Sequence, residues 1–175
     1  MSEDDFAELM VARLAACADV LHAHGIRLGL EFLAPPSIRQ ALGIAYAGLS
    51  SLERMLDVID AIGVDRAGIV LDSWHWYASG ASSTSLERLT DDLLVEVHVN
   101  DAPKGVPLEL LVDNRRRLPG ATGVIPLAGF FDALRKLEYS GPVVVEPFDD
   151  RVNPLDDEAA LALVAGSLDP FLPRH

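Results

Sequence analysis

The sequence predicts an α/β fold in which a parallel sheet is covered by helices. Short apolar runs rich in Val, Ile and Leu alternate with segments of helical periodicity along the whole chain. These runs are continuously apolar, which is typical of strands buried on both faces in a parallel sheet. The 175 residues contain no internal linker and no low-complexity tract, so we expect a single domain over residues 1–175.

The helices follow from apolar stripes and from the residues that start and stop them. Ser50 is expected to cap the second helix, and Gly63 to end it. Pro126 opens a later helix, because proline is favoured in the first turn. The predicted helices cover residues 4–24, 52–62, a short segment capped by Thr84, residues 126–138 and residues 155–168.

The strands are the apolar runs between these helices. They are bounded by glycine, proline and small polar residues, which favour turns. The predicted strands cover residues 26–32, 67–71, 93–99 and a run beginning at 142–145, and the main predicted loops cover residues 34–46, 73–83 and 100–124.

Charge and composition exclude several classes of function. The formal net charge of −13 argues against a surface that binds nucleic acid or an anionic membrane. No apolar stretch approaches the length of a membrane span, and the acidic start MSEDDFAELM does not resemble a signal peptide. With Cys17 as the only cysteine, we expect a cytoplasmic protein. The one basic cluster, residues 115–117, is predicted to be a solvated loop in preference to a phosphate site.

Four acidic or imidazole side chains stand where the four predicted strands end. They are Glu31, Asp72, His98 and Glu146. A buried strand end is unfavourable for a carboxylate unless its charge is compensated, and reactive residues collect at the carboxyl ends of parallel strands. We therefore predict that the four converge on one divalent cation. A shell of three carboxylates and one imidazole suits Mn²⁺ or Mg²⁺ first, with Co²⁺, Fe²⁺ or Zn²⁺ as alternatives.

Each of these residues alone also has a structural interpretation. Glu31 and Glu146 could pair with nearby arginines such as Arg39 and Arg151. The aspartate could cap a turn, and the histidine could be a core residue bonded to a carbonyl. Glu96 shares a strand face with the histidine and could compete as a ligand.

Two further residues are candidates for binding a substrate. His75, three residues after the strand-end aspartate, is placed to hydrogen-bond a substrate oxygen. The aromatic residues around it suit either the C–H face of a sugar or a hydrophobic loop that closes the domain. Lys104 could bind a substrate hydroxyl or phosphate, although taken alone this residue is better explained as an ordinary solvated lysine. Asp101 could hold Lys104 or support the ligands.

These segments resemble a known family. LGLEFL, VLDSWHW, VEVHVNDAPKG and GPVVVEPF look like the strand ends of the sugar phosphate isomerase/epimerase family, the xylose isomerase-like group of TIM barrels. The segment RRLPGATGVIPLAGFFDALRKLEYSGPVVVE is similar to that family's last crossover. The resemblance implies metal binding by Glu31, Asp72, His98 and Glu146, and substrate contacts by His75 and Lys104. It also implies proton transfer by the first and last glutamates.

The resemblance implies a metal-dependent isomerase or epimerase of a sugar, sugar phosphate or related ketose. Proton abstraction would occur next to a metal-chelated carbonyl, and the site of reprotonation would separate isomerisation from epimerisation. A dehydratase of a cyclic polyol is an alternative on the same ligands. A non-catalytic metal-binding half-barrel is a third reading. The family's endonuclease chemistry is disfavoured by the acidic charge.

The chain departs from the family in length. A full barrel has eight βα units in about 250 residues, whereas this sequence has four strands, which match the family's last four. We therefore expect a partial barrel with two open sheet edges. The interpretations are a truncated chain, a complementary N-terminal half, or a homo-oligomer formed through the open edges.

Overall fold

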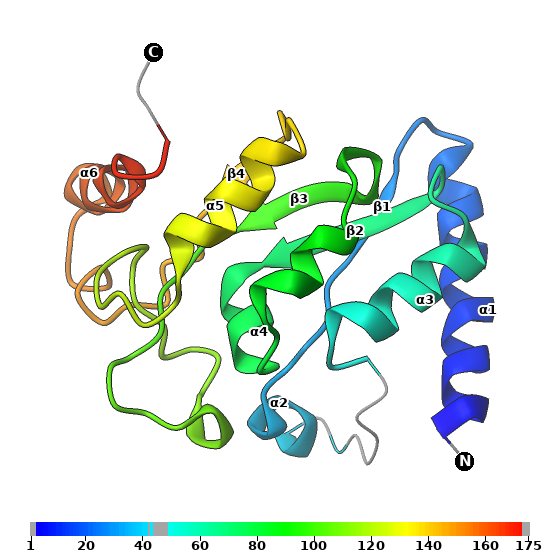
Figure 1. The fold of residues 1–175 in the computed structure, drawn as a ribbon, viewed down its shortest axis with the longest axis horizontal. Coiled ribbons are helices and arrows are strands. Elements are labelled where there is room, and N and C mark those ends of the chain that lie inside the picture. Colours follow the sequence, from blue (N-terminus) through cyan, green and yellow to red (C-terminus); the bar gives the residue numbers. More distant parts are fainter. Residues whose placement is uncertain (1–2, 42, 44–48, 173–175) are drawn as a thin grey trace.

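A computed structural model describes residues 3–41, 43 and 49–172 of the chain (Figure 1). Its centre is a four-stranded parallel sheet in the order β1-β2-β3-β4. The strands are β1 (Leu28–Leu30), β2 (Ala67–Asp72), β3 (Leu94–His98) and β4 (Val143–Val144). Within the described residues, β1 and β4 each pair with one neighbour, so the sheet is open. The predicted parallel α/β fold is confirmed.

The register of the strands aligns their carboxyl ends along one edge of the sheet. Asp72, the last residue of β2, pairs with His98, the last residue of β3. His98 in turn pairs with Val144 of β4. Glu31 follows β1 directly. Because all four strands run in the same direction, the side chains that follow them meet at one edge.

Four longer helices flank the sheet on one face and at its ends: α1 (Glu3–His22), α3 (Leu52–Ile62), α5 (Leu127–Lys136) and α6 (Asp157–Leu168). Helices α3 and α5 lie along one face of the sheet, whereas α1 and α6 lie at opposite ends of the molecule (Figure 1). Helix α1 packs against α3. Pro126 occupies the N-cap of α5, next to its predicted place inside the helix.

Helix α3 shows how the sequence fixes its local structure. Ser51, rather than the expected Ser50, is the N-cap, and its side chain accepts a hydrogen bond from the Arg54 amide. The helix ends at Gly63, whose φ of 109° is open to glycine and strained for other residues. Its buried face consists of apolar residues at helical spacing: Leu52, Met55, Leu56, Val58, Ile59 and Ile62.

Two segments expected to be loops contain short helices, α2 (Pro36–Ala41) and α4 (Ser73–Ala78). Helix α4 forms because the Asp72 side chain accepts a hydrogen bond from the Trp74 amide at 2.7 Å and so caps it. The short helix predicted from Thr84 is a 3₁₀ helix, η1 (Ser83–Arg88). Two further 3₁₀ turns, η2 (Asp91–Leu93) and η3 (Leu108–Leu110), lie in the loops on either side of β3. The part of the 34–46 loop at residues 42 and 44–46 falls outside the described residues.

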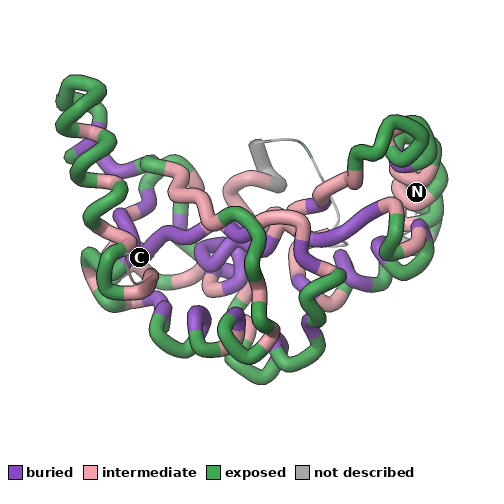
Figure 2. Tube along the Cα trace, turned by 90° about the horizontal axis from the view of Figure 1, so that it is seen from above, coloured by how far each residue is buried: buried purple, intermediate pink, exposed green. Residues whose placement is uncertain are grey.

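The core lies between the sheet and the helices on its face. Phe32, Ile69 and Phe130 are completely buried there. Helix α6 differs, because none of its described residues is buried although its sequence is largely apolar (Figure 2). Leu161, on this helix, is 70% exposed. None of the described helices has both the length and the apolar character needed to cross a membrane.

Candidate metal centre

The four strand-end residues come together at the carboxyl edge of the sheet. His98 Nδ1 lies 3.6 Å from Glu31 Oε1 and 3.8 Å from Glu146 Oε2. One ligand atom each from Asp72, His98 and Glu146 lie within 4.8 Å of one another. Residues that end or follow four consecutive strands therefore lie close together at one edge of the sheet.

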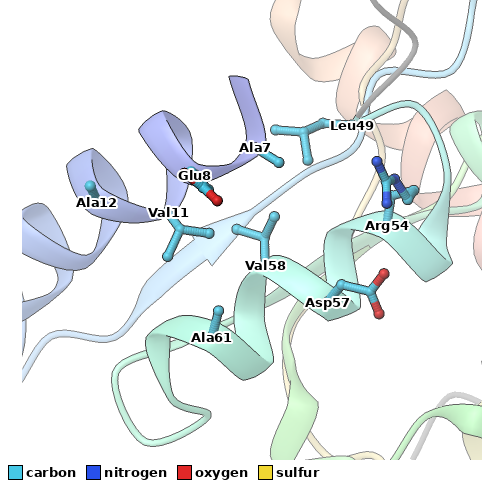
Figure 3. Close-up of a pocket in the computed structure, with 9 residues that line it drawn as sticks. All are labelled: Ala7, Glu8, Val11, Ala12, Leu49, Arg54, Asp57, Val58 and Ala61. Carbon is cyan, nitrogen blue, oxygen red and sulfur yellow. The ribbon is translucent and has the colours of Figure 1, made fainter. Parts of the chain in front are cut away.

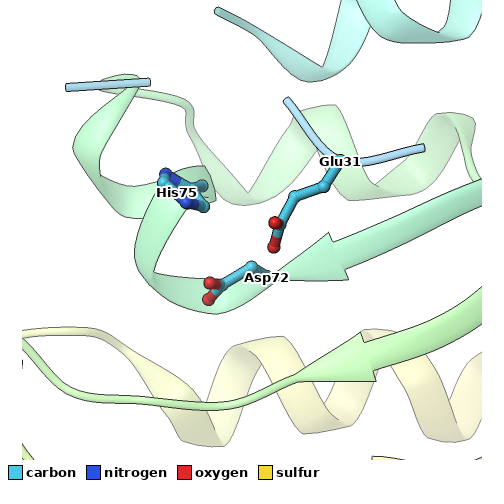
Figure 4. Close-up of side chains that lie close together, drawn as sticks. All are labelled: Glu31, Asp72 and His75. Atoms are coloured by element: carbon cyan, nitrogen blue, oxygen red, sulfur yellow. The ribbon is translucent and has the colours of Figure 1, made fainter. Parts of the chain in front are cut away.

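His75 lies beside this group. Atoms of Glu31, Asp72 and His75 also lie within 4.8 Å of one another (Figure 4). His75 comes from α4 and is 1% exposed. Its Nδ1 accepts a hydrogen bond from the Ala34 amide at 3.4 Å, and its Nε2 lies 3.4 Å from Arg116 Nη2 and 3.7 Å from Asp113 Oδ1. Burial is the largest influence on this imidazole and lowers its pKa, so it is neutral at neutral pH.

Two of the converging atoms are buried polar groups without a hydrogen-bond partner. They are Glu31 Oε1 and His98 Nδ1, which face each other. Burying a carboxylate oxygen and an imidazole nitrogen without a hydrogen bond costs free energy, unless a proton or a cation bridges the two atoms. Both atoms are good ligands for a divalent cation. The donor set therefore fits a metal ion.

Glu96 supports the orientation of the His98 ring. Its Oε2 lies 3.4 Å from His98 Nε2, on the opposite side of the ring from Glu31 and Glu146. A carboxylate near Nε2 favours the tautomer whose Nδ1 carries the free lone pair. Glu96 thus faces the ring nitrogen of His98 that points away from Glu31 and Glu146.

The carboxyl group of Glu31 is strongly perturbed. Burial, followed by the charges of Asp72 and Glu146, raises the pKa of Glu31 to about 8. Three carboxylates close together cannot all carry charge without compensation. A bound cation or a proton on Glu31 would relieve this repulsion.

The site contains an arginine, Arg116, that the sequence analysis predicted to lie in a solvated loop. Arg116 is 1% exposed and lies among the proposed ligands. Its Nη1 donates to Asp72 Oδ2 at 2.5 Å and lies 3.0 Å from Glu146 Oε2. The prediction of a solvated loop for residues 115–117 is therefore wrong at its central residue. The RRLPG motif marked this position, but adjacent arginines look equivalent in sequence.

Asp101 and Lys104 lie in very different environments. Asp101 is completely buried, and its two carboxylate oxygens accept hydrogen bonds from the backbone amides of Ala102, Thr122, Gly123 and Ile125. It organises the loop between β3 and α5. Lys104 is exposed in the same loop, and the cation that contacts the proposed ligands is Arg116.

These contacts also bear on the structural interpretations of the single residues. Arg151 pairs with Asp149 rather than with Glu146. The side chain of Arg39 is outside the described residues. Trp74 and Trp76 are 0% and 2% exposed, so they belong to the core, as the hydrophobic-loop interpretation predicts. Asp72 does cap a helix, but only its Oδ1 is used, and Oδ2 faces the site.

One of the surface grooves of the molecule lies away from these residues. It is a groove between α1 and α3 lined by apolar side chains such as Val11, Leu49 and Val58, with Arg54 and Asp57 at one end (Figure 3). None of the proposed ligands lines it. The chemistry of the molecule is concentrated at the strand ends.

Comparison with known proteins agrees with the fold. The chain is 26% identical over 159 residues to the inosose isomerase of Bacillus subtilis (strain 168), covering 91% of this chain and 53% of that protein. It is 29% identical over 100 residues to the D-psicose 3-epimerase of Enterocloster bolteae, covering 57% of this chain and 29% of that protein. The chain thus spans about half the length of the inosose isomerase that it matches.

Solved structures share the fold of this chain. A xylose isomerase domain protein from Alicyclobacillus acidocaldarius superposes with a TM-score of 0.80 at 31% identity, covering 98% of this chain and 59% of that one. The IOLI protein with a binding zinc atom superposes with a TM-score of 0.85 at 23% identity, covering 99% of this chain and 60% of that one. The model of the family described as "Xylose isomerase-like TIM barrel" matches residues 2–167. On this match the chain belongs to the xylose isomerase-like TIM barrel family.

Proposed function

We propose that the chain carries the metal-binding and proton-transfer residues of a divalent-metal-dependent isomerase or epimerase of a ketose or related cyclic ketone. The observation that supports this most directly is the pair of buried, unpartnered atoms Glu31 Oε1 and His98 Nδ1, with Asp72 and Glu146 beside them. Mn²⁺ or Mg²⁺ suits this mainly oxygen donor set.

The relatives support the reaction class. Their names are inosose isomerase, D-psicose 3-epimerase and L-ribulose 3-epimerase, which all describe rearrangement of a small polyhydroxy ketone. The likeness to the zinc-binding structure, at 23% identity, bears on the fold alone. The metal proposal rests on the donor atoms of this chain.

The residues of the chain have complementary tasks in such a reaction. A divalent cation held by Glu31, Asp72, His98 and Glu146 would polarise the carbonyl and neighbouring hydroxyl of a ketose. Glu31 and Glu146 follow the two outer strands, and both approach Nδ1 of His98, at 3.6 Å and 3.8 Å. One glutamate would remove the proton next to the carbonyl, and the other would return one.

The supporting residues would orient the substrate. His75, neutral at neutral pH and within 4.8 Å of Glu31 and Asp72, would hydrogen-bond a substrate oxygen. Lys104, exposed in the loop after β3, would contact a substrate hydroxyl or phosphate at the rim of the site. Because these two residues differ greatly in burial, the first would fix the reacting carbons and the second would act on the distal end.

Hydrogen exchange is the direct test. We would incubate the chain with Mn²⁺ in D₂O with a panel of inososes, psicose and ribulose, and follow loss of the C–H signal next to the carbonyl by NMR. Wild type should exchange this hydrogen, and Glu146→Gln should abolish exchange and reduce bound manganese in elemental analysis. Glu109→Gln, an exposed residue in η3, is the matched control.

Each outcome has a distinct meaning. Unchanged manganese content in Glu146→Gln would contradict the assignment of that ligand. Bound manganese without exchange on any ketone would favour a non-catalytic metal-binding subunit. Loss of water from an inosose, with exchange, would favour the dehydratase alternative on the same residues.

A further inference from the structure

The guanidinium of Arg116 is fixed on every side. Its Nε donates to the Asp113 carbonyl at 3.1 Å, and Nη2 donates to Asp113 Oδ1 at 2.5 Å. Its Nη1 also donates to Asn100 Oδ1 at 3.2 Å. The guanidinium carbon lies 4.7 Å from the ring centre of Trp74 and 5.4 Å from that of Phe148. A planar cation held by hydrogen bonds at its edge and by aromatic rings has little freedom to move.

The backbone around Arg116 is equally constrained. The Arg116 amide donates to the Phe148 carbonyl at 2.9 Å. Arg117 and Asp101 exchange two backbone hydrogen bonds of 2.8 Å each. The Leu118 amide donates to Asp149 Oδ2 at 3.1 Å. The loop that carries Arg116 is therefore tied both to the end of β3 and to the segment after β4.

This fixed cation contacts two of the proposed metal ligands. Its Nη1 lies 2.5 Å from Asp72 Oδ2 and 3.0 Å from Glu146 Oε2. Three carboxylate ligands carry a charge of minus three when ionised, and a divalent cation together with Arg116 supplies plus three. The charges of the three ligands are then compensated, whereas Asp113, which also pairs with Arg116, is partly exposed to solvent.

We propose that Arg116 is a positioning residue that acts as a built-in counter-charge for the metal ligands. It holds the Asp72 and Glu146 carboxylates together when no metal is bound, and its positive charge lowers the affinity of the site for divalent cations. A bound cation would remain exchangeable for this reason, because Arg116 already offsets part of the charge that attracts it. This inference rests on the proposed function, which supplies the metal.

Mn²⁺ binding to Arg116→Gln and wild type tests the proposal. Calorimetric titration should give a dissociation constant at least about tenfold lower in the variant, because a positive charge beside the ligands has been removed. In EDTA the variant should unfold at a lower temperature than wild type, and saturating Mn²⁺ should recover more of its stability. Arg115→Gln removes the same charge from the exposed neighbouring position and should change neither quantity.

Two more variants separate the effect of the charge from that of the hydrogen bonds and of folding. Arg116→Lys keeps the charge without the fork of donors, so it should lose stability while its Mn²⁺ affinity stays close to that of wild type. Arg116→Met replaces Arg116→Gln if the latter does not fold, since an unbranched apolar side chain fits between Trp74 and Phe148. Weaker or unchanged Mn²⁺ binding in the Gln or Met variant would overturn the role of Arg116. A wild-type chain that binds no Mn²⁺ would instead overturn the metal site itself.

Discussion

Individual residues at the strand ends have two tasks, one in the fold and one in the proposed chemistry. Asp72 caps α4 through Oδ1 and faces Arg116 and the proposed metal position through Oδ2. His98 presents one ring nitrogen to Glu96 and the other to Glu31. The fold thereby orients the donor atoms before any cation or substrate binds, which lowers the cost of ordering them.

The contact between Glu96 and His98 gives a prediction at this scale. Glu96→Ala should weaken Mn²⁺ binding about tenfold, because the imidazole loses the carboxylate that orients it. Glu96→Gln keeps an acceptor near Nε2 and should recover part of the affinity. Calorimetric titration measures both, and equal affinities in wild type and Glu96→Ala would show that the 3.4 Å contact is incidental.

At the scale of elements, buried carboxylates hold the long connections in place. Asp101 fixes the loop between β3 and α5 by accepting four backbone hydrogen bonds. Asp149 fixes the segment after β4 by accepting from the Leu118 amide and pairing with Arg151. These connections have little regular structure, so side-chain acceptors replace the missing backbone ladder.

Loss of the Asp101 carboxylate should destabilise the fold strongly. Asp101→Asn places an NH₂ group opposite two backbone amides, and each unsatisfied buried donor costs about 1–3 kcal/mol. We expect a loss of about 3 kcal/mol in the free energy of unfolding, measured by urea denaturation. Asp150→Asn, at an exposed position, should remain within about 0.5 kcal/mol of wild type.

The contact between Asp149 and Arg151 should give a pH-dependent contribution. The hydrogen bond from Arg151 is the main cause that lowers the pKa of Asp149 from 3.8 to about 2. A carboxyl group with a lowered pKa in the folded state stabilises the fold above pH 3.8, and this contribution is lost as the pH falls towards 2.

Asp149→Asn should therefore cost about 1–2 kcal/mol at pH 7, a value reduced for the exposure of Arg151. The difference from wild type should shrink between pH 4 and pH 2 as wild-type Asp149 takes up its proton. Thermal unfolding across this range measures it. A difference that stays constant down to pH 2 would show that the ion pair contributes nothing.

The whole molecule is an open sheet with an apolar helix at one end. Among the described strands, β1 and β4 each have a free edge, and α6 buries none of its residues (Figure 2). Free strand edges and exposed apolar helices favour association. Within the described residues, the two ends of the sheet are thus the surfaces that a second copy or a complementary half-barrel would cover.

We expect the purified chain to associate at micromolar concentration, in light scattering or sedimentation. Leu161→Glu, which places a charge on the exposed face of α6, should reduce association. Leu110→Glu is the matched control, because Leu110 is 65% exposed in η3, away from α6. A well-folded wild-type monomer across the concentration range would contradict this expectation.

The sequence by itself determined the parallel α/β fold and the four residues of the candidate site. Both follow from patterns that are local in the chain: continuous apolar runs, and one polar residue at the end of each run. Parallel pairing then brings the strand ends together without further information. Helix α4 was missed because its N-cap, Asp72, looked like the start of a turn.

Only the tertiary structure decided the position of Arg116. In sequence it is the middle of three arginines, and periodicity cannot tell a buried cation from a solvated one. Its burial depends on contacts with Asp72, 44 residues away, and with Glu146 on the other side of the loop. Long-range electrostatic contacts of this kind have no local pattern, because they are created when separate strands place their ends at one edge of the sheet.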